Sequence, residues 1–220
     1  MEPFPPPHMV WAPGETRWHC YALPDYARDA SLGELIGRSR AAALEVAGDA
    51  LAAVEDEWVH ATVSMISVPA AELESGVVEA LARGLGRVLA DVPGFRLPAR
   101  WPWAADGSVL MGLAEEEVAG RPWDVLSGLV MRAIDEQFGS RAMQYVPPPP
   151  HVTLAYCAKA TEGAAIEAAL REVNQATQVQ QVQQAYMSIG EVYLVDVRQD
   201  AVAHTYTWNK ETVIRIPLGT

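Results

Sequence analysis

Two short, nearly uncharged runs constrain the fold of this chain more than any other feature of its sequence. The first covers residues 59–68 and stops at Pro69, and the second covers residues 151–157 and follows four consecutive prolines at 147–150. Apolar, β-branched runs of this length, bounded by proline, are typical of buried strands. Each run carries the tripeptide His-x-Thr, whose two polar side chains project from the same face of a strand.

The segments around these two runs follow a similar order in both halves of the chain. Apolar periodicity predicts helices over 31–52, 73–88, 122–138 and 161–173, the first opened by a capping box of Ser31 and Glu34. Further strands are expected over 17–24, 95–103 and 109–113, with two or three more between 187 and 217. Because several strands follow one another without a helix between them, the pattern favours an α+β fold with antiparallel or mixed sheets. The repeated order suggests an internal duplication.

The ends and the cysteines bear on domain organisation. The first sixteen residues include five prolines and no basic segment followed by an apolar core, so they do not resemble a secretory signal. We expect a stiff, poorly ordered leader over residues 1–16 and a single domain over residues 17–220. Cys20 and Cys157 are the two cysteines and lack metal-ligand spacing, which favours a reduced, cytoplasmic protein.

The charge balance narrows the classes of partner. Sixteen basic against 28 acidic residues give a formal net charge of −12. Duplex nucleic acid is bound by basic faces that release counterions, so we expect no long duplex as a partner. No apolar run reaches the length of a membrane span, so no membrane partner is expected.

The two tripeptides, His60-Ala-Thr62 and His151-Val-Thr153, carry the chemistry. Each histidine could be an ordinary strand residue beside a threonine favoured for its strand propensity. The repetition on matching strands favours function, because two imidazoles can flank one reacting group, one removing a proton while the other supplies one. The sequence contains no Walker loop, no carboxylate pair at metal spacing and no His-Glu-x-x-His helix, so no metal and no cofactor are predicted.

These motifs make a specific resemblance visible. The stretch Pro150-His-Val-Thr-Leu-Ala, the earlier His60-Ala-Thr-Val and their separation of about ninety residues resemble the two-histidine phosphoesterase superfamily. The opening strand at 17–24 adds to this similarity, which is greatest to the bacterial RNA 2′,3′-cyclic phosphodiesterase and 2′-5′ RNA ligase-like branch. It covers about residues 17–218, but the proline-rich leader and the segment 99–107 have no counterpart in it.

The resemblance implies a bilobal α+β fold with pseudo-twofold symmetry. Two antiparallel sheets would face a central cleft, with helices on the outer faces, and each lobe would donate one His-x-Thr motif. The resemblance also implies metal-independent chemistry on cyclic or 2′-linked phosphate esters. His60 and His151 would act as general acid and base, in an order that the sequence leaves open. Thr62 and Thr153 would donate hydrogen bonds to phosphoryl oxygens.

The expected function is hydrolysis of a 2′,3′-cyclic phosphate or a 2′-5′ phosphodiester by a monomeric enzyme without a cofactor. The substrate would be a nucleotide, a short RNA end with a cyclic phosphate, or a related metabolite. Two alternatives remain open at this point. One is the reverse reaction, ligation of RNA ends through a 2′-5′ bond, and the other is a nucleotide-binding protein without useful turnover.

Other residues are weaker candidates for substrate contact. His19 and Tyr21 occupy alternate positions of the first strand and could face the cleft. Four further aromatic residues could stack on a base, although interior packing is favoured for each of them: Trp58, Tyr145, Tyr206 and Trp208. Strand alternation places Tyr156 on the face opposite His151, which favours core packing for this tyrosine.

Overall fold

The computed structural model describes residues 1–143, 148–179 and 184–219. The helices of this part are α1 (Ala30–Ala47), α2 (Val77–Leu89), α3 (Pro122–Phe138) and α4 (Gly163–Val179). The strands in its first half are β1 (Thr16–Ala22), β2 (Leu51–Ala53), β3 (Ala61–Met65), β4 (Phe95–Ala104) and β5 (Ser108–Leu113). The later strands are β6 (His151–Cys157), β7 (Tyr186–Ile189), β8 (Glu191–Asp200), β9 (Thr205–Trp208) and β10 (Ile214–Pro217).

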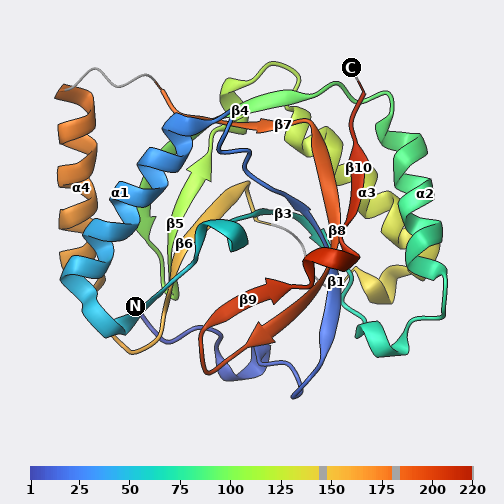
Figure 1. Cartoon of the computed structure of the whole chain (residues 1–220), viewed down its shortest axis with the longest axis horizontal. Coiled ribbons are helices and arrows are strands. Elements are labelled where there is room, and N and C mark those ends of the chain that lie inside the picture. The colour runs from blue at the N-terminus through green and yellow to red at the C-terminus, as the bar shows by residue number, and fades with distance from the viewer. Residues whose placement is uncertain (144–147, 180–183, 220) are drawn as a thin grey trace.

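The strands form one curled antiparallel sheet in the order β10-β8-β1-β3-β6-β5-β4-β7, with β2 added to β6 and β9 added to β8 (Figure 1). The α+β class is therefore confirmed, but the expectation of two separate sheets is corrected. In the described part of the chain, β3 and β6 join the two halves of the sheet through the single residue pair Ala61 and Val152. The halves stay connected because this pair keeps the backbone ladder continuous across the middle of the sheet.

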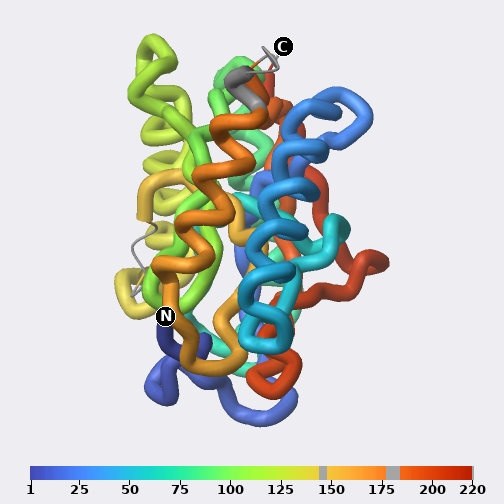
Figure 2. The backbone as a smooth tube through the Cα atoms, turned by 90° about the vertical axis from the view of Figure 1, so that its left-hand side faces the viewer, coloured from blue at the N-terminus to red at the C-terminus, as the bar shows by residue number. Residues whose placement is uncertain are grey.

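Two helix pairs cover the outer face of the sheet. Helices α1 and α4 pack on each other and against β4, β5 and β6, as Figure 2 shows from the side. Helices α2 and α3 pack on each other and against β3 and β10. The buried faces of all four helices are mainly aliphatic, with Ile36, Leu85, Leu126 and Ile166 fully buried. This leaves the inner face of the curled sheet open to form a site.

Most elements lie where the sequence predicts them, and the exceptions have local causes. Helix α1 ends at Gly48, whose φ of 55° is readily adopted only by glycine, so residues 51–53 are free to form β2. The predicted capping box is wrong, because the N-cap of α1 is Asp29. The described residues after 184 contain four strands where two or three were expected. Part of the glutamine-rich stretch lies outside the described residues.

None of the helices in the described ranges is both long and apolar enough to span a membrane.

The first fifteen residues pack along the lower edge of the sheet in the view of Figure 1. The amino group of Met1 donates to the carbonyl oxygen of Thr161 at 2.7 Å. The Phe4 ring stacks on Tyr156, with ring centroids 4.8 Å apart and planes 13° apart. Gly107 allows this approach, because a Cβ there would lie 3.2 Å from the Cβ of Phe4. The Trp11 backbone amide donates to the Gln199 side chain at 2.8 Å, which ties this segment to β8.

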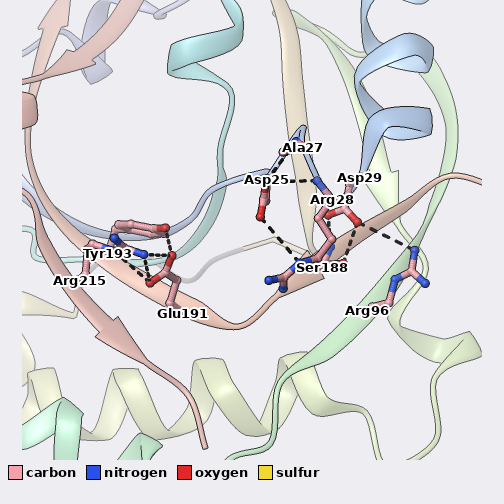
Figure 3. Close-up of polar contacts among 9 residues, drawn as sticks. All are labelled: Asp25, Ala27, Arg28, Asp29, Arg96, Ser188, Glu191, Tyr193 and Arg215. Carbon is pink, nitrogen blue, oxygen red and sulfur yellow. Dashed lines mark hydrogen bonds and ion pairs between the residues drawn. The ribbon is translucent and has the colours of Figure 1, made fainter. Parts of the chain in front are cut away.

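A buried carboxylate links α1 to β7, as Figure 3 shows. Asp29 is only 2% exposed and accepts hydrogen bonds from the Ser188 backbone amide at 2.6 Å and from its hydroxyl at 2.7 Å. The guanidinium of Arg96 on β4 lies 3.9 Å from the same carboxylate. The N-cap residue of the helix thus bonds to a strand instead of capping its own helix. The link fixes the start of α1 relative to the edge of the sheet.

We predict that Asp29→Ala lowers the free energy of unfolding by about 3 kcal/mol, because it leaves the buried amide and hydroxyl of Ser188 without an acceptor. The matched control is Asp25→Ala. Asp25 lies in the same loop but is half exposed, so we expect a loss below about 1 kcal/mol. Urea denaturation monitored by tryptophan fluorescence measures both values. Equal losses in the two variants would contradict the structural role of Asp29.

Candidate active site

The first His-x-Thr motif runs from the residue before β3 into that strand, and the second begins the neighbouring strand β6. Because Ala61 pairs with Val152 in antiparallel register, Thr62 lies across from His151, and His60 lies across from Thr153. Cβ atoms in such positions are about 5 Å apart. All four side chains line the same cavity, whose volume is about 380 Å³. The register therefore brings together the four residues that the sequence predicts as catalytic.

Each motif strand bulges directly after its threonine. The pairing of β3 with β1 skips Val63, and the pairing of β6 with β5 skips Leu154. A bulge inserts one residue and reverses the alternation of faces beyond it. As a result, Met65 and Tyr156, each three residues after a motif threonine, also line the cavity. The prediction that Tyr156 lies on the opposite face from His151 is therefore wrong, and the bulge is the reason.

Both motif histidines are held in the same way by the backbone. The Nδ1 of His60 lies 2.7 Å from the carbonyl oxygen of Trp58, and the Nδ1 of His151 lies 2.9 Å from the carbonyl oxygen of Pro149. A carbonyl oxygen only accepts, so each Nδ1 carries a proton and donates it. This leaves Nε2 as the proton-exchanging nitrogen of both rings. The pseudo-symmetry that the sequence suggests thus extends to the partner of each histidine, two residues before it.

The surroundings of His60 keep it neutral. Its ring stacks on Tyr21, with centroids 3.9 Å apart and planes 17° apart, and the Trp208 ring meets it edge-on at 5.7 Å. Burial under these rings lowers the pKa of His60 to about 4; the Trp58 carbonyl bond opposes this pKa shift, and the charge of His151 adds to it. A neutral His60 presents a lone pair at Nε2 and is ready to accept a proton.

A third histidine supports this stack. His19 is 5% exposed, and its Nδ1 lies 2.6 Å from the hydroxyl oxygen of Tyr21. Burial holds the pKa of His19 well below its usual range, and the nearby charges of His60 and Arg17 lower that pKa further. Its Nε2 has no hydrogen-bond partner within the described part of the chain. His19 therefore positions the tyrosine that lies against His60.

The remaining wall of the cavity is mainly aromatic. Trp11 from the N-terminal segment meets His19 edge-on at 5.7 Å and Tyr206 at 5.8 Å. Phe4 and Tyr156 form a second stacked face of the same cavity. Phe4 and Trp11 were not predicted from the sequence as site residues, because their positions depend on how the N-terminal segment packs. Tyr156 was assigned to the core, because the bulge in β6 was not foreseen. The cavity offers flat apolar faces on one side and hydrogen-bonding groups on the other.

Arg17 is the one lysine or arginine among the described residues that line the cavity. Its Nε lies 2.7 Å from a carboxylate oxygen of Glu15, and its guanidinium lies over the Trp11 ring at 5.0 Å. The charge of Arg17 is thus partly balanced before any ligand binds. A small anion would be held mainly by hydroxyl and imidazole groups.

The structure places the other predicted site residues as follows. His19 and Tyr21 line the cavity beside the motif residues. Trp208 is 6% exposed and contacts the Tyr21 and His60 rings, but it is not among the described residues of the cavity wall. Tyr145 lies outside the described residues. Within those residues, no group of three or more His, Cys, Asp or Glu side chains is arranged to hold a metal ion.

Comparisons with known proteins identify the fold. No family model matches the sequence, and no curated protein does. Escherichia coli LigT, crystallised with 3′-AMP, superposes with a TM-score of 0.60 at 16% identity, over 94% of this chain and 99% of LigT. A Thermus thermophilus protein superposes with a TM-score of 0.59 at 15% identity, over 91% of this chain and 97% of that protein. A protein described as a phosphoesterase superposes with a TM-score of 0.57 at 14% identity, over 94% of this chain and 99% of that protein. LigT has also been crystallised with ATP and with NADP⁺. The chain has the LigT fold, which confirms the α+β fold that the sequence resemblance implies, except that one curled sheet takes the place of two separate sheets.

The buried neutral histidines predict how stability depends on pH. An unfolded histidine has a pKa of about 6.5. Because burial lowers the pKa of His19 and of His60 in the folded chain, the unfolded chain binds more protons below pH 6.5. The free energy of unfolding should therefore fall as the pH drops from about 6.5 toward 4. We expect His19→Gln to reduce the fall in the free energy of unfolding between pH 7 and pH 5, by at most about 2 kcal/mol.

Chemical denaturation at the two pH values measures this difference. His8→Gln serves as the control, because His8 is exposed and is not buried with the other rings. The same pH dependence in His19→Gln and in the unsubstituted protein would show that His19 does not enter the linkage.

Proposed function

We propose that this chain is a metal-independent phosphoesterase that hydrolyses a 2′,3′-cyclic phosphate or a 2′-5′ phosphodiester of a nucleotide. The observation that carries this proposal is the pair of histidines on one cavity, each anchored through Nδ1 and each free to exchange a proton through Nε2. The binding of 3′-AMP by LigT, which shares this fold, supports a nucleotide as the ligand.

We assign the base to His60 and the acid to His151. Neutral His60 takes a proton from a water molecule, whose oxygen forms a bond to phosphorus. On the opposite side the bond from phosphorus to the leaving oxygen breaks, and His151 gives that oxygen a proton. A cyclic phosphate then yields a phosphomonoester with a free neighbouring hydroxyl. The lowered pKa of His60 supports this direction, because a base must be neutral before it can act.

The threonines of the motifs bind the non-bridging oxygens in this proposal. Thr62 lies across from His151 and Thr153 lies across from His60, so each hydroxyl lies beside the opposite histidine. Hydrogen bonds from the hydroxyls stabilise charge on the phosphoryl oxygens in the transition state. The same arrangement needs no metal ion to position the phosphate.

The nucleoside lies against the aromatic wall formed by Trp11, Tyr156 and Tyr206. Aromatic faces stack on bases with little sequence preference. His19 and Tyr21 line the cavity, where they contact the substrate, and Tyr21 stacks on His60. Trp208 does not contact the substrate and positions the His60 ring. Tyr145 stays a prediction as a stacking residue.

The acidic chain and the cavity volume of about 380 Å³ favour a small substrate over long RNA. We expect a monomer. Two free, buried cysteines suit a reducing compartment such as the cytoplasm.

The first functional prediction concerns metal dependence and the two histidines. With 2′,3′-cyclic nucleotides and 2′-5′ dinucleotides as substrates, we expect turnover in the presence of EDTA. His60→Ala and His151→Ala should each lower kcat/KM by about 100-fold or more, and the double variant should not multiply the losses, because the pair acts as a unit. Thr62→Ala and Thr153→Ala should each cost about 1–3 kcal/mol of transition-state stabilisation.

Product formation followed by chromatography tests these expectations. Ligation of cyclic-phosphate RNA ends in the same panel would favour the reverse reaction, and binding without turnover would favour a nucleotide-binding protein. Loss of activity with EDTA, restored by one specific metal, would overturn the proposed chemistry.

The second functional prediction concerns pH. The pH dependence of kcat/KM reports groups of the free enzyme, and a base must lose its proton to act. Since burial lowers the pKa of His60 to about 4, activity should persist on acidification and fall only as the pH approaches that value. The falling parts of the pH profile report the coupled titration of both histidines rather than that of either residue alone. An acidic limb near pH 6.5 in a steady-state profile would argue against neutral His60 as the base.

A further inference from the structure

A second groove continues from the catalytic cavity on the side of His151. Its volume is about 1,000 Å³, and it shares His151, Leu110 and Pro148 with the cavity. Its outer wall comes from the β4–β5 hairpin, which includes the segment 99–107 that has no counterpart in the sequence resemblance. His151 thus lies between two connected spaces, and residues 99–103 form part of the wall of the second space.

Trp103 is placed over the backbone beside His151. Trp103 pairs with Leu110 across β4 and β5, and Gly112 pairs with His151 across β5 and β6. A Cβ at Gly112 would lie 3.3 Å from Cζ3 of the Trp103 ring. The indole therefore covers the glycine that lies directly across from the catalytic histidine, and any larger residue there would displace it.

The groove leaves aromatic surface uncovered. Trp103 is 37% exposed and Trp101 is 36% exposed, although tryptophan is usually well buried in a folded chain. Exposed tryptophan beside a reactive group is suited to stacking on a nucleobase. The charged residues of the groove are Arg100, Glu116 and Glu117, and Arg100 is paired with Glu116. These three side chains give the groove a net negative charge, which favours an uncharged nucleoside over a further phosphate.

We propose that this groove is a second nucleoside subsite, in which Trp103 stacks on the base of the leaving nucleoside. The substrate class is then a 2′-5′-linked dinucleoside monophosphate, with one nucleoside against Trp11 and Tyr206 and the other against Trp103. This inference rests on the proposed function and adds to it the identity of the leaving group, which is a nucleoside.

The placement agrees with the roles of the two histidines. The groove adjoins His151, the proposed acid, so the oxygen that receives the proton belongs to the nucleoside bound there. Water, deprotonated by His60, forms the new bond to phosphorus, and the bond to the 5′-oxygen breaks. The products are a nucleoside 2′-phosphate in the catalytic cavity and a nucleoside with a free 5′-hydroxyl in the groove.

The test compares kcat/KM for 2′-5′-linked diadenosine monophosphate with kcat/KM for 2′,3′-cyclic AMP. Trp103→Leu keeps an apolar side chain but removes the aromatic face, and it should lower the ratio of the two values by about 10-fold or more. Trp103→Phe keeps an aromatic face and should hold the ratio within about 3-fold. Val125→Ala, at an exposed position of α3, is the control and should not change the ratio. An unchanged ratio in Trp103→Leu, or hydrolysis of the cyclic substrate alone by the unsubstituted protein, would overturn the subsite.

Failure of the proposed function has a different outcome. If the unsubstituted protein hydrolyses neither substrate, calorimetric binding decides whether the subsite exists. The dinucleoside monophosphate should then bind about 10-fold more tightly than 2′-AMP, and Trp103→Leu should remove the difference. Equal affinities of the unsubstituted protein for the two ligands would show that Trp103 holds no second nucleoside.

Discussion

The pairing of Ala61 with Val152 is the contact on which the rest of the site depends. Among the described residues, it is the one pair through which the two halves of the curled sheet exchange backbone bonds at β3 and β6. Both residues are fully buried, so the outer faces of these strands are fixed against the helices. A shift of one residue in this register would turn every side chain of a strand to the other face. The antiparallel register alone therefore brings His60 and His151 to a single cavity.

The bulges at Val63 and Leu154 modify this arrangement in the same way on both strands. Without them, strict alternation would place Met65 and Tyr156 among the helices. With them, each strand directs three side chains into the cavity, a histidine, a threonine and a larger residue. The two motif strands are thus alike in their backbones as well as in their tripeptides.

The sequence predicted the residues that depend on local pattern and missed those that depend on distant contacts. Proline boundaries and strand composition located β1, β3 and β6, and the repeated tripeptide pointed to the four residues that the fold brings to one cavity. Strand alternation failed for Tyr156, because a bulge depends on the neighbouring strand and leaves no local signal. Asp29 was missed in the same way. Its carboxylate bonds to Ser188, which is 159 residues away, so local capping rules could not identify its role.

Each of the two histidines is held by the same kind of hydrogen bond, but the residues that surround the two rings differ. The i−2 carbonyl fixes the same tautomer in both rings, which by itself would give two equivalent groups. His60 lies beneath Tyr21 and beside Trp208, whereas His151 borders the groove of Trp103 and Gly112. Acid–base catalysis needs one neutral and one charged partner, so equivalent histidines would compete for both roles. The aromatic packing around one motif removes that symmetry, and this difference is what the proposed assignment of base and acid depends on.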